Sequence, residues 1–184
     1  MARPVPYIEN VVAAARLGGP FDIAGLARRL KGSEYHPDRF AGLVVHVPEG
    51  SALVFEDGTI ITTGARGVEE ALAQMEHVRT LLGQAGADTT GVEGFTVRNI
   101  VLSLDLGKPI PLAPTALAFP GEDLTYDAER FPGLVVHWQD PKVTLIAFAS
   151  GRIVATGSGD LPAVEEALGG FVSALEQREL VVTG

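Results

Sequence analysis

The sequence repeats itself, and this duplication limits the chain to folds that two copies of one unit can build. Three segments of the first half recur in the same order in the second half: 8–17 in 97–106, 34–47 in 125–138, and 52–65 in 145–158. Asn10 and Asn99 lie 89 positions apart (99 − 10), and Thr63 and Thr156 lie 93 apart (156 − 63). The period is too long and the copies too few for a solenoid, so we expect one pseudo-symmetric domain whose halves share a core.

Each half is expected to contain the same elements in the same order. A strand comes first, followed by a short helix, a tight turn with Tyr35 or Tyr126, three strands and a long helix. Asp22 suits the N-cap of the first short helix, and Pro114 suits the first turn of the second. The expected strands and long helices are 7–17, 43–47, 51–56, 59–65 and 67–85 in one half, and 96–106, 134–139, 142–149, 152–158 and 161–179 in the other.

Apolar residues at helical spacing in both long helices predict one buried face for each. Gly58 and Gly151 mark short turns, so the strands that they join are expected to pair antiparallel. Helices on one face of an antiparallel sheet define an α+β protein, with a linker at about residues 86–95. The apolar residues are Val68, Leu72, Met75 and Leu82 in the first helix, and Val164, Leu168, Phe171, Val172 and Leu175 in the second.

The strands are apolar on both faces, although the second face of such a sheet is usually polar. If Val54 and Ala147 face the helices, strand alternation turns the residues beside them away from the helices. These residues are Leu53, Phe55, Ile146 and Phe148. A wide apolar surface that the few helices leave uncovered indicates a binding surface. The pattern alone equally allows a face buried against a dimer partner.

Composition excludes several classes of function. The formal net charge of −9 disfavours a nucleic-acid partner when it is taken alone. Much of the acid, however, lies in the long helices. The absence of cysteine excludes disulfides and Cys-ligated metals. There is no P-loop, HExxH or nucleophile elbow, and we interpret His46 and His137 as sheet or surface residues. We therefore expect no enzyme, cofactor or metal. Without a signal peptide or an apolar run of membrane-spanning length, we expect a cytoplasmic protein.

Several motifs, each weak alone, together resemble the TATA-box-binding protein (TBP) family. The resemblance covers about residues 7–180 in both repeats, and the bare-core length is similar to archaeal members. It implies a pseudo-twofold saddle with repeats at 1–92 and 93–184, a curved antiparallel ten-stranded sheet, and four helices on its convex face. The motifs are Glu9-Asn10-Val11-Val12, Arg98-Asn99-Ile100-Val101, Glu34-Tyr35-His36-Pro37, Arg130-Phe131-Pro132-Gly133-Leu134, Leu53-Val54-Phe55 and Thr63-Gly64-Ala65.

The resemblance implies a general transcription initiation factor that binds the minor groove of TATA-like, A·T-rich promoter DNA and kinks it. Paired phenylalanines would wedge into base steps, asparagine and threonine would donate to adenine N3 or thymine O2, and arginines would contact phosphates. The wedge pairs would be Phe40 with Phe55 and Phe131 with Phe148, beside Ala41 and Pro132. The remaining contacts would be Asn10, Asn99, Thr63, Thr156, Val12, Val101, Leu53, Ile61, Ile146, Val154, Arg39 and Arg130.

The resemblance also implies protein partners. The loop before Phe131 would dock a B-type transcription initiation factor through Asp127 and Glu129, and thereby recruit RNA polymerase indirectly. The same loop can equally be read as a solvated turn. The protein would be associated with the nucleoid of a cell without a nucleus, have no membrane partner, and possess an apolar underside that can pair two free copies.

The first repeat departs from the family pattern. Phe40 and Phe55 lie 15 positions apart (55 − 40), against 17 for Phe131 and Phe148 (148 − 131), so a hairpin is two residues shorter. Glu49, Glu56 and Asp57 stand where the family usually has phosphate-binding cations, whereas the second repeat keeps Lys142 and Arg152. We expect weaker DNA binding by the first half. The alternative function is a divergent paralogue that acts as a protein-interaction module with weak or no DNA binding.

Overall fold

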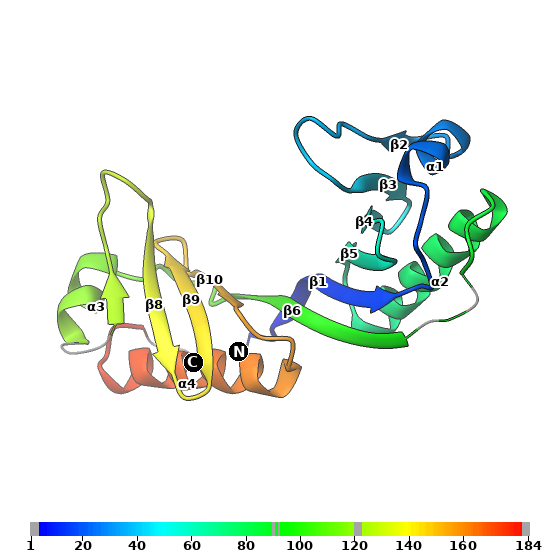
Figure 1. Ribbon diagram of the computed structural model, residues 1–184. Helices are drawn as coiled ribbons and strands as arrows, with labels where there is room; N and C mark the ends of the chain where they lie inside the picture. Colours follow the sequence, from blue (N-terminus) through cyan, green and yellow to red (C-terminus); the bar gives the residue numbers. More distant parts are fainter. Residues whose placement is uncertain (1–3, 90, 92, 120–122, 182–184) are drawn as a thin grey trace. The chain divides into compact units, whose positions relative to one another are not determined.

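The computed structural model describes residues 4–89, 91, 93–119 and 123–181. It divides the chain into two compact units, one of residues Asn10–Arg98 and one of Met1–Glu9 with Asn99–Gly184. The two units therefore do not coincide with the two halves of the sequence, because the first nine residues go with the second repeat. Figure 1 shows the same elements in each unit.

The unit of residues Asn10–Arg98 is an antiparallel sheet with helices on one face (Figure 1). Its core joins Leu17, Leu26 and Ile60 to Met75 and Leu82 of the long helix. The strands pair in the order β2 (Ser33–Glu34), β3 (Leu43–Val47), β4 (Gly50–Val54), β5 (Thr59–Ala65) and β1 (Tyr7–Arg16), and the helices are α1 (Ile23–Arg29) and α2 (Val68–Gln84). The Asp22 carboxylate accepts a hydrogen bond from Gly25 N at 2.9 Å, which confirms the predicted N-cap of α1.

The second unit has the same plan. Phe171 of α4 is fully buried, and its ring packs against Phe119 and Trp138 at centroid distances of 5.8 and 6.4 Å. The helix α4 packs against β9 and β10, and α3 packs against β8 (Figure 1). The strands pair in the order β6 (Glu93–Asp105), β10 (Arg152–Thr156), β9 (Lys142–Phe148), β8 (Gly133–Gln139) and β7 (Asp123–Thr125), and the helices are α3 (Leu112–Ala118) and α4 (Leu161–Gln177).

The predicted α+β class is confirmed, since the described residues form ten antiparallel strands and four helices. One prediction about α2 is wrong: Val68 and Leu72 are 40% and 46% exposed. The helix instead turns Ala71 and Gln74 inward beside Met75, and Gln74 Nε2 donates to Thr63 O at 3.0 Å. A small residue and a bonded amide thus form part of the buried face, in place of Val68 and Leu72. The apolar face predicted for α4 is confirmed, apart from the half-buried Val172.

The linker between the repeats is shorter than expected. The strand β6 begins at Glu93 rather than at residue 96. Residues 90 and 92 of the predicted linker, and with them the predicted boundary after residue 92, lie outside the described residues. No helix in the described part of the chain is long and apolar enough to cross a membrane.

Replacing Thr62 by valine should stabilise the protein. The Thr62 hydroxyl is fully buried on β5 and has no hydrogen-bond partner among the described residues, and Ala155 stands at the equivalent position of the second repeat. A buried polar group without a partner costs free energy. We therefore expect Thr62→Val to raise the free energy of unfolding by about 1 kcal/mol in urea denaturation. Thr63→Val, which removes a bonded hydroxyl, is the control; a lower stability of Thr62→Val would contradict the expectation.

Candidate nucleic-acid interface

In each unit, the strands have one face that the helices do not cover, and we call this the uncovered face of that unit. In β4, Ala52 and Val54 are completely buried, whereas the alternating Leu53 is half-buried. In β9, Leu145 and Ala147 are completely buried, and the side chains between and after them are half-buried. The prediction that apolar residues point away from the helices is confirmed. The half-buried predicted contacts are Asn10, Val12, Leu53, Phe55, Ile61 and Thr63 in one unit, and Asn99, Val101, Ile146, Phe148, Val154 and Thr156 in the other.

An asparagine and a threonine form the same hydrogen-bonded pair in both units. Asn10 Nδ2 donates to Thr63 Oγ1 at 3.0 Å, and Asn99 Nδ2 donates to Thr156 Oγ1 at 2.9 Å. Each Oδ1 accepts from the next backbone amide, Gly64 N at 2.6 Å or Gly157 N at 2.8 Å. Because the amide group carries two N–H donors, each asparagine is fixed in orientation and keeps one donor for an external acceptor.

The predicted wedge residues form two aromatic pairs with similar geometry. Phe40 and Phe55 lie 5.6 Å apart between ring centroids, at an interplanar angle of 74°. Phe131 and Phe148 lie 6.1 Å apart at 61°. Both arrangements are edge-to-face, which is favourable for aromatic rings. Phe40 and Phe131 are each 40% exposed, so each pair presents one ring to solvent and supports it with a half-buried second ring.

Two glycines that the sequence-based prediction missed allow the rings to lie this close to the sheet. A Cβ atom added at Gly42 would lie 2.6 Å from Phe40 Cε1, and one at Gly133 would lie 2.7 Å from Phe131 Cε1. Such distances exclude a side chain unless the ring moves. The glycines stand at equivalent positions of the two repeats, two residues after the exposed phenylalanine. That recurrence is the signal that could have identified them.

The loops that carry Phe40 and Phe131 share one turn. His36 O accepts from the backbone amides of the third and fourth following residues, and Asp127 O does the same. The Asp127 carboxylate also accepts from Glu129 N at 3.1 Å and lies 3.4 Å from Arg130 Nε. Asp127 therefore shapes its loop, whereas Glu129 is exposed at the loop surface. Arg39, Ala41, Arg130 and Pro132 are exposed beside the rings.

The acidic residues of the first repeat make local contacts. Glu49 Oε2 lies 3.3 Å from His77 Nδ1 on α2. Asp57 accepts from Thr59 N at 2.9 Å and from Thr59 Oγ1 at 3.0 Å. These backbone and hydroxyl hydrogen bonds hold the pKa of Asp57 below its usual range. Asp57 therefore keeps its negative charge at neutral pH.

The expected difference in hairpin length is present. In the first unit, five residue pairs lie between the pair of Leu43 with Val54 and the pair of Val47 with Gly50, both included. In the second unit, six pairs lie between the equivalent pair of Leu134 with Ala147 and the pair of Gln139 with Lys142. Both hairpins close with a two-residue turn, so one pair is missing from the first. The longer hairpin brings the exposed Lys142 to its end.

His46 and His137 lie on the strands, as interpreted from the sequence. His46 contacts Ser51 Oγ and Glu34 Oε1, each at 3.1 Å, and His137 contacts Thr144 Oγ1 at 3.3 Å. Among the described residues, no group of three or more His, Asp or Glu side chains is placed to hold a metal ion.

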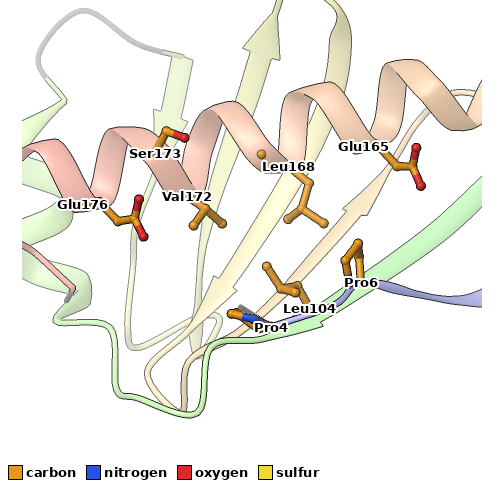
Figure 2. A pocket seen from close by; sticks show the side chains of 9 residues that line it. Pro4, Pro6, Leu104, Glu165, Leu168, Val172, Ser173 and Glu176 are labelled. Atoms are coloured by element: carbon orange, nitrogen blue, oxygen red, sulfur yellow. The ribbon is translucent and has the colours of Figure 1, made fainter. Parts of the chain in front are cut away.

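A separate hollow of about 220 Å³ lies beside α4 on the helix-covered side of the second unit. Figure 2 shows Leu168 and Val172 of α4 facing Leu104 of β6 and the prolines of the N-terminal segment, with Glu165 and Glu176 on the same helix. None of the predicted interface residues lines this hollow, so it is not part of the candidate interface.

The comparisons agree with the repeat and the fold. The profile of the family described as transcription factor TFIID (or TATA-binding protein, TBP) matches residues 5–85 and 94–178. The TATA-box-binding protein of Archaeoglobus fulgidus is 38% identical over 152 residues, which cover 82% of this chain and 83% of that protein. TATA-box-binding protein E of Halobacterium salinarum is 35% identical over 176 residues, 95% of each chain. The solved structure of Methanococcus jannaschii TBP matches with a TM-score of 0.83 and 32% identity over 95% of this chain and 99% of that one.

The family match and the fold place this two-repeat α+β protein in the class of transcription factors, not of enzymes. The chain belongs to the TATA-box-binding protein family, and its relatives named above are archaeal.

Proposed function

We propose that the protein is a general transcription initiation factor that binds the minor groove of TATA-like, A·T-rich promoter DNA. The observation that carries this proposal is the recurrence, on the uncovered face of each unit, of an edge-to-face phenylalanine pair and a fixed asparagine–threonine pair. The same polar and aromatic groups at equivalent positions indicate that both repeats contact the same kind of ligand.

The chemistry of these groups fits A·T pairs. The minor groove of A·T presents acceptors only, whereas guanine adds an amino donor. The free N–H of Asn10 or Asn99 can donate to adenine N3 or thymine O2, and the apolar residues around it offer nothing to guanine. Flat phenylalanine rings carry no donor or acceptor, so they can enter a base step without leaving a polar group unpaired. Insertion at flexible TA steps kinks the duplex at low cost.

The two halves of the interface are expected to contribute unequally. Arg39 and Arg130 are equivalent, but the second unit adds Lys142 and Arg152, whereas the first carries Glu56 and the ionised Asp57 at the turn equivalent to the one before Arg152. Carboxylates repel phosphates, and salt screens that repulsion. The second half therefore supplies more of the electrostatic affinity, and the strongest kink is expected at its end of the site.

A DNA-bending titration tests the proposal. We expect the protein to bind and bend a TATA duplex, and to bind a G·C duplex of equal length at least about tenfold more weakly, because guanine amino groups meet no acceptor. Energy transfer between dyes at the two duplex ends measures binding and bending together at several salt concentrations. Equal affinity for the two duplexes, with no bending, would exclude the proposal and favour the protein-interaction module with its apolar faces docked on protein or on a second free copy.

The exposed loop at Glu129 is proposed to dock a B-type transcription initiation factor, which in turn recruits RNA polymerase. We expect Glu129→Arg to abolish formation of the ternary complex with an archaeal B-type factor on TATA DNA, because it reverses the charge at the exposed position of the loop. Binding of DNA alone should be retained or strengthened, since the change adds positive charge beside Arg130 and leaves both aromatic pairs intact. Gel shifts with and without the factor measure both effects; Glu69→Arg on α2 is the control. Unchanged recruitment by Glu129→Arg would refute this docking site.

A further inference from the structure

Arg152 lies on the strand next to the one that carries Phe148 in the second unit. It is the first residue of β10, and the pairing of Ile153 with Ala147 puts it across the hairpin from Phe148. Alternation along β10 turns Arg152 to the same face as Val154 and Thr156, since Ile153 and Ala155 between them are completely buried. A duplex on that face therefore meets the Arg152 guanidinium beside the Phe131–Phe148 pair.

This guanidinium is already engaged. Arg152 Nη2 donates to Glu9 Oε1, and the two side chains form an ion pair at relative exposures of 45% and 30%. The same Glu9 oxygen accepts from Tyr7 Oη at 3.4 Å. Glu9 belongs to the same compact unit as Arg152, although 143 positions separate the two residues. The other nearby carboxylate, Asp105, pairs in register with Arg152 and accepts from Gly107 N at 2.8 Å.

The fold does not require this ion pair. The positions equivalent to Glu9 and Arg152 in the other repeat hold Arg98 and Thr59. Thr59 bonds to Asp57 instead, and that unit forms the same five-stranded sheet without the charge pair. The pairing is thus a property of one repeat, at the turn that leads into β10.

We propose that Glu9 sets the affinity of the protein for DNA by competing with a backbone phosphate for Arg152. This inference rests on the proposed function. A carboxylate and a phosphate bind a guanidinium through the same planar set of N–H donors. DNA must therefore displace or share the Glu9 carboxylate before Arg152 can neutralise a phosphate. Glu9 therefore lowers the affinity for DNA and reduces the number of counterions released on binding. It also weakens the phosphate contact that Arg152 makes beside the Phe131–Phe148 pair.

A double-mutant cycle on DNA binding tests the competition, using the full chain, Glu9→Gln, Arg152→Gln and the double variant. With a TATA duplex at low salt, we expect Glu9→Gln to raise affinity about threefold to tenfold and to steepen the dependence of log K on log salt by up to about one. Arg152→Gln should lower affinity and flatten the same slope by about one. In the Arg152→Gln background, Glu9→Gln should change affinity less than about twofold.

Glu166→Gln on α4 is the matched control, because it removes the same charge from the helix-covered side of the same unit. Circular dichroism and urea denaturation of every variant verify folding. An equal gain from Glu9→Gln with and without Arg152 would show a general charge effect and overturn the inference. A loss of affinity in Glu9→Gln would show that Glu9 positions Arg152, and would overturn it as well. If the wild type does not prefer TATA over G·C DNA, the proposed function fails; if it does and the cycle shows no coupling, the competition alone fails.

Discussion

The double variant Phe131→Ala, Phe148→Ala is expected to bind a TATA duplex at least about 100-fold more weakly than the wild type and to lose most of the bending. Each phenylalanine that leaves water on insertion contributes about 1.5–3 kcal/mol. The two rings lie in one edge-to-face pair on the uncovered face, and Phe131 is already 40% exposed. Energy transfer across the duplex measures both quantities.

The control is Leu117→Ala, which removes an apolar side chain that is 84% exposed on α3, away from the uncovered face. It should leave affinity within about twofold of the wild type. The corresponding variant Phe40→Ala, Phe55→Ala tests the other unit. Its loss of DNA affinity should be smaller, because nearby carboxylates already weaken DNA binding by that unit. If the Phe131→Ala, Phe148→Ala variant still bends DNA, the kink does not depend on these two rings, and the proposal that they insert into a base step is contradicted.

Phe171→Ala is expected to lower the free energy of unfolding by about 3–5 kcal/mol. Phe171 is completely buried on α4 and contacts the rings of Phe119 and Trp138, so its removal leaves a cavity that rigid neighbours cannot fill. A loss of this size is a large fraction of the stability of an ordinary domain. Chemical denaturation followed by Trp138 fluorescence measures it directly, because this is the only tryptophan of the chain.

Val172→Ala is the matched control, because Val172 follows on the same helix but is only half-buried beside the hollow of Figure 2. We expect it to cost about 1 kcal/mol or less. Similar losses in both variants would show that the space around Phe171 collapses on truncation. A broad transition in Phe171→Ala alone would show that the second unit no longer unfolds as one cooperative body.

Most of the elements could be predicted because each copy of the repeat supports the other. The strand β3 begins and ends where the pattern places it, and Asp22 caps α1 as expected. The face of α2 could not be predicted, because alanine and a bonded glutamine replace the large apolar residues that define such a face. The strands β2 and β7 are too short for any periodicity, so only the resemblance to a ten-stranded family implied them.

The candidate site was predicted residue by residue, but its contacts were not. The sequence singles out Asn10 and Thr63 separately, and only the fold shows that they bond to each other. The role of Gly42 beneath Phe40 depends on a distance between atoms, which no spacing in the sequence encodes. The ion pair of Glu9 with Arg152 joins residues from opposite ends of the chain, and neither has a counterpart of like charge in the other repeat.

The division into units bears on the ancestry of the duplication. The segment Met1–Glu9 is part of the unit that holds the second repeat, and Glu93–Arg98 at the start of β6 is part of the unit that holds the first. A single-copy ancestor with this architecture would have needed a second molecule to supply the corresponding strand end, as in a domain-swapped dimer. In a chain that carries both copies the exchange is intramolecular, and a high effective concentration replaces dimerisation. Within one chain, each copy can then carry its own charges, as Glu9 and Arg152 of one unit and Arg98 and Thr59 of the other do.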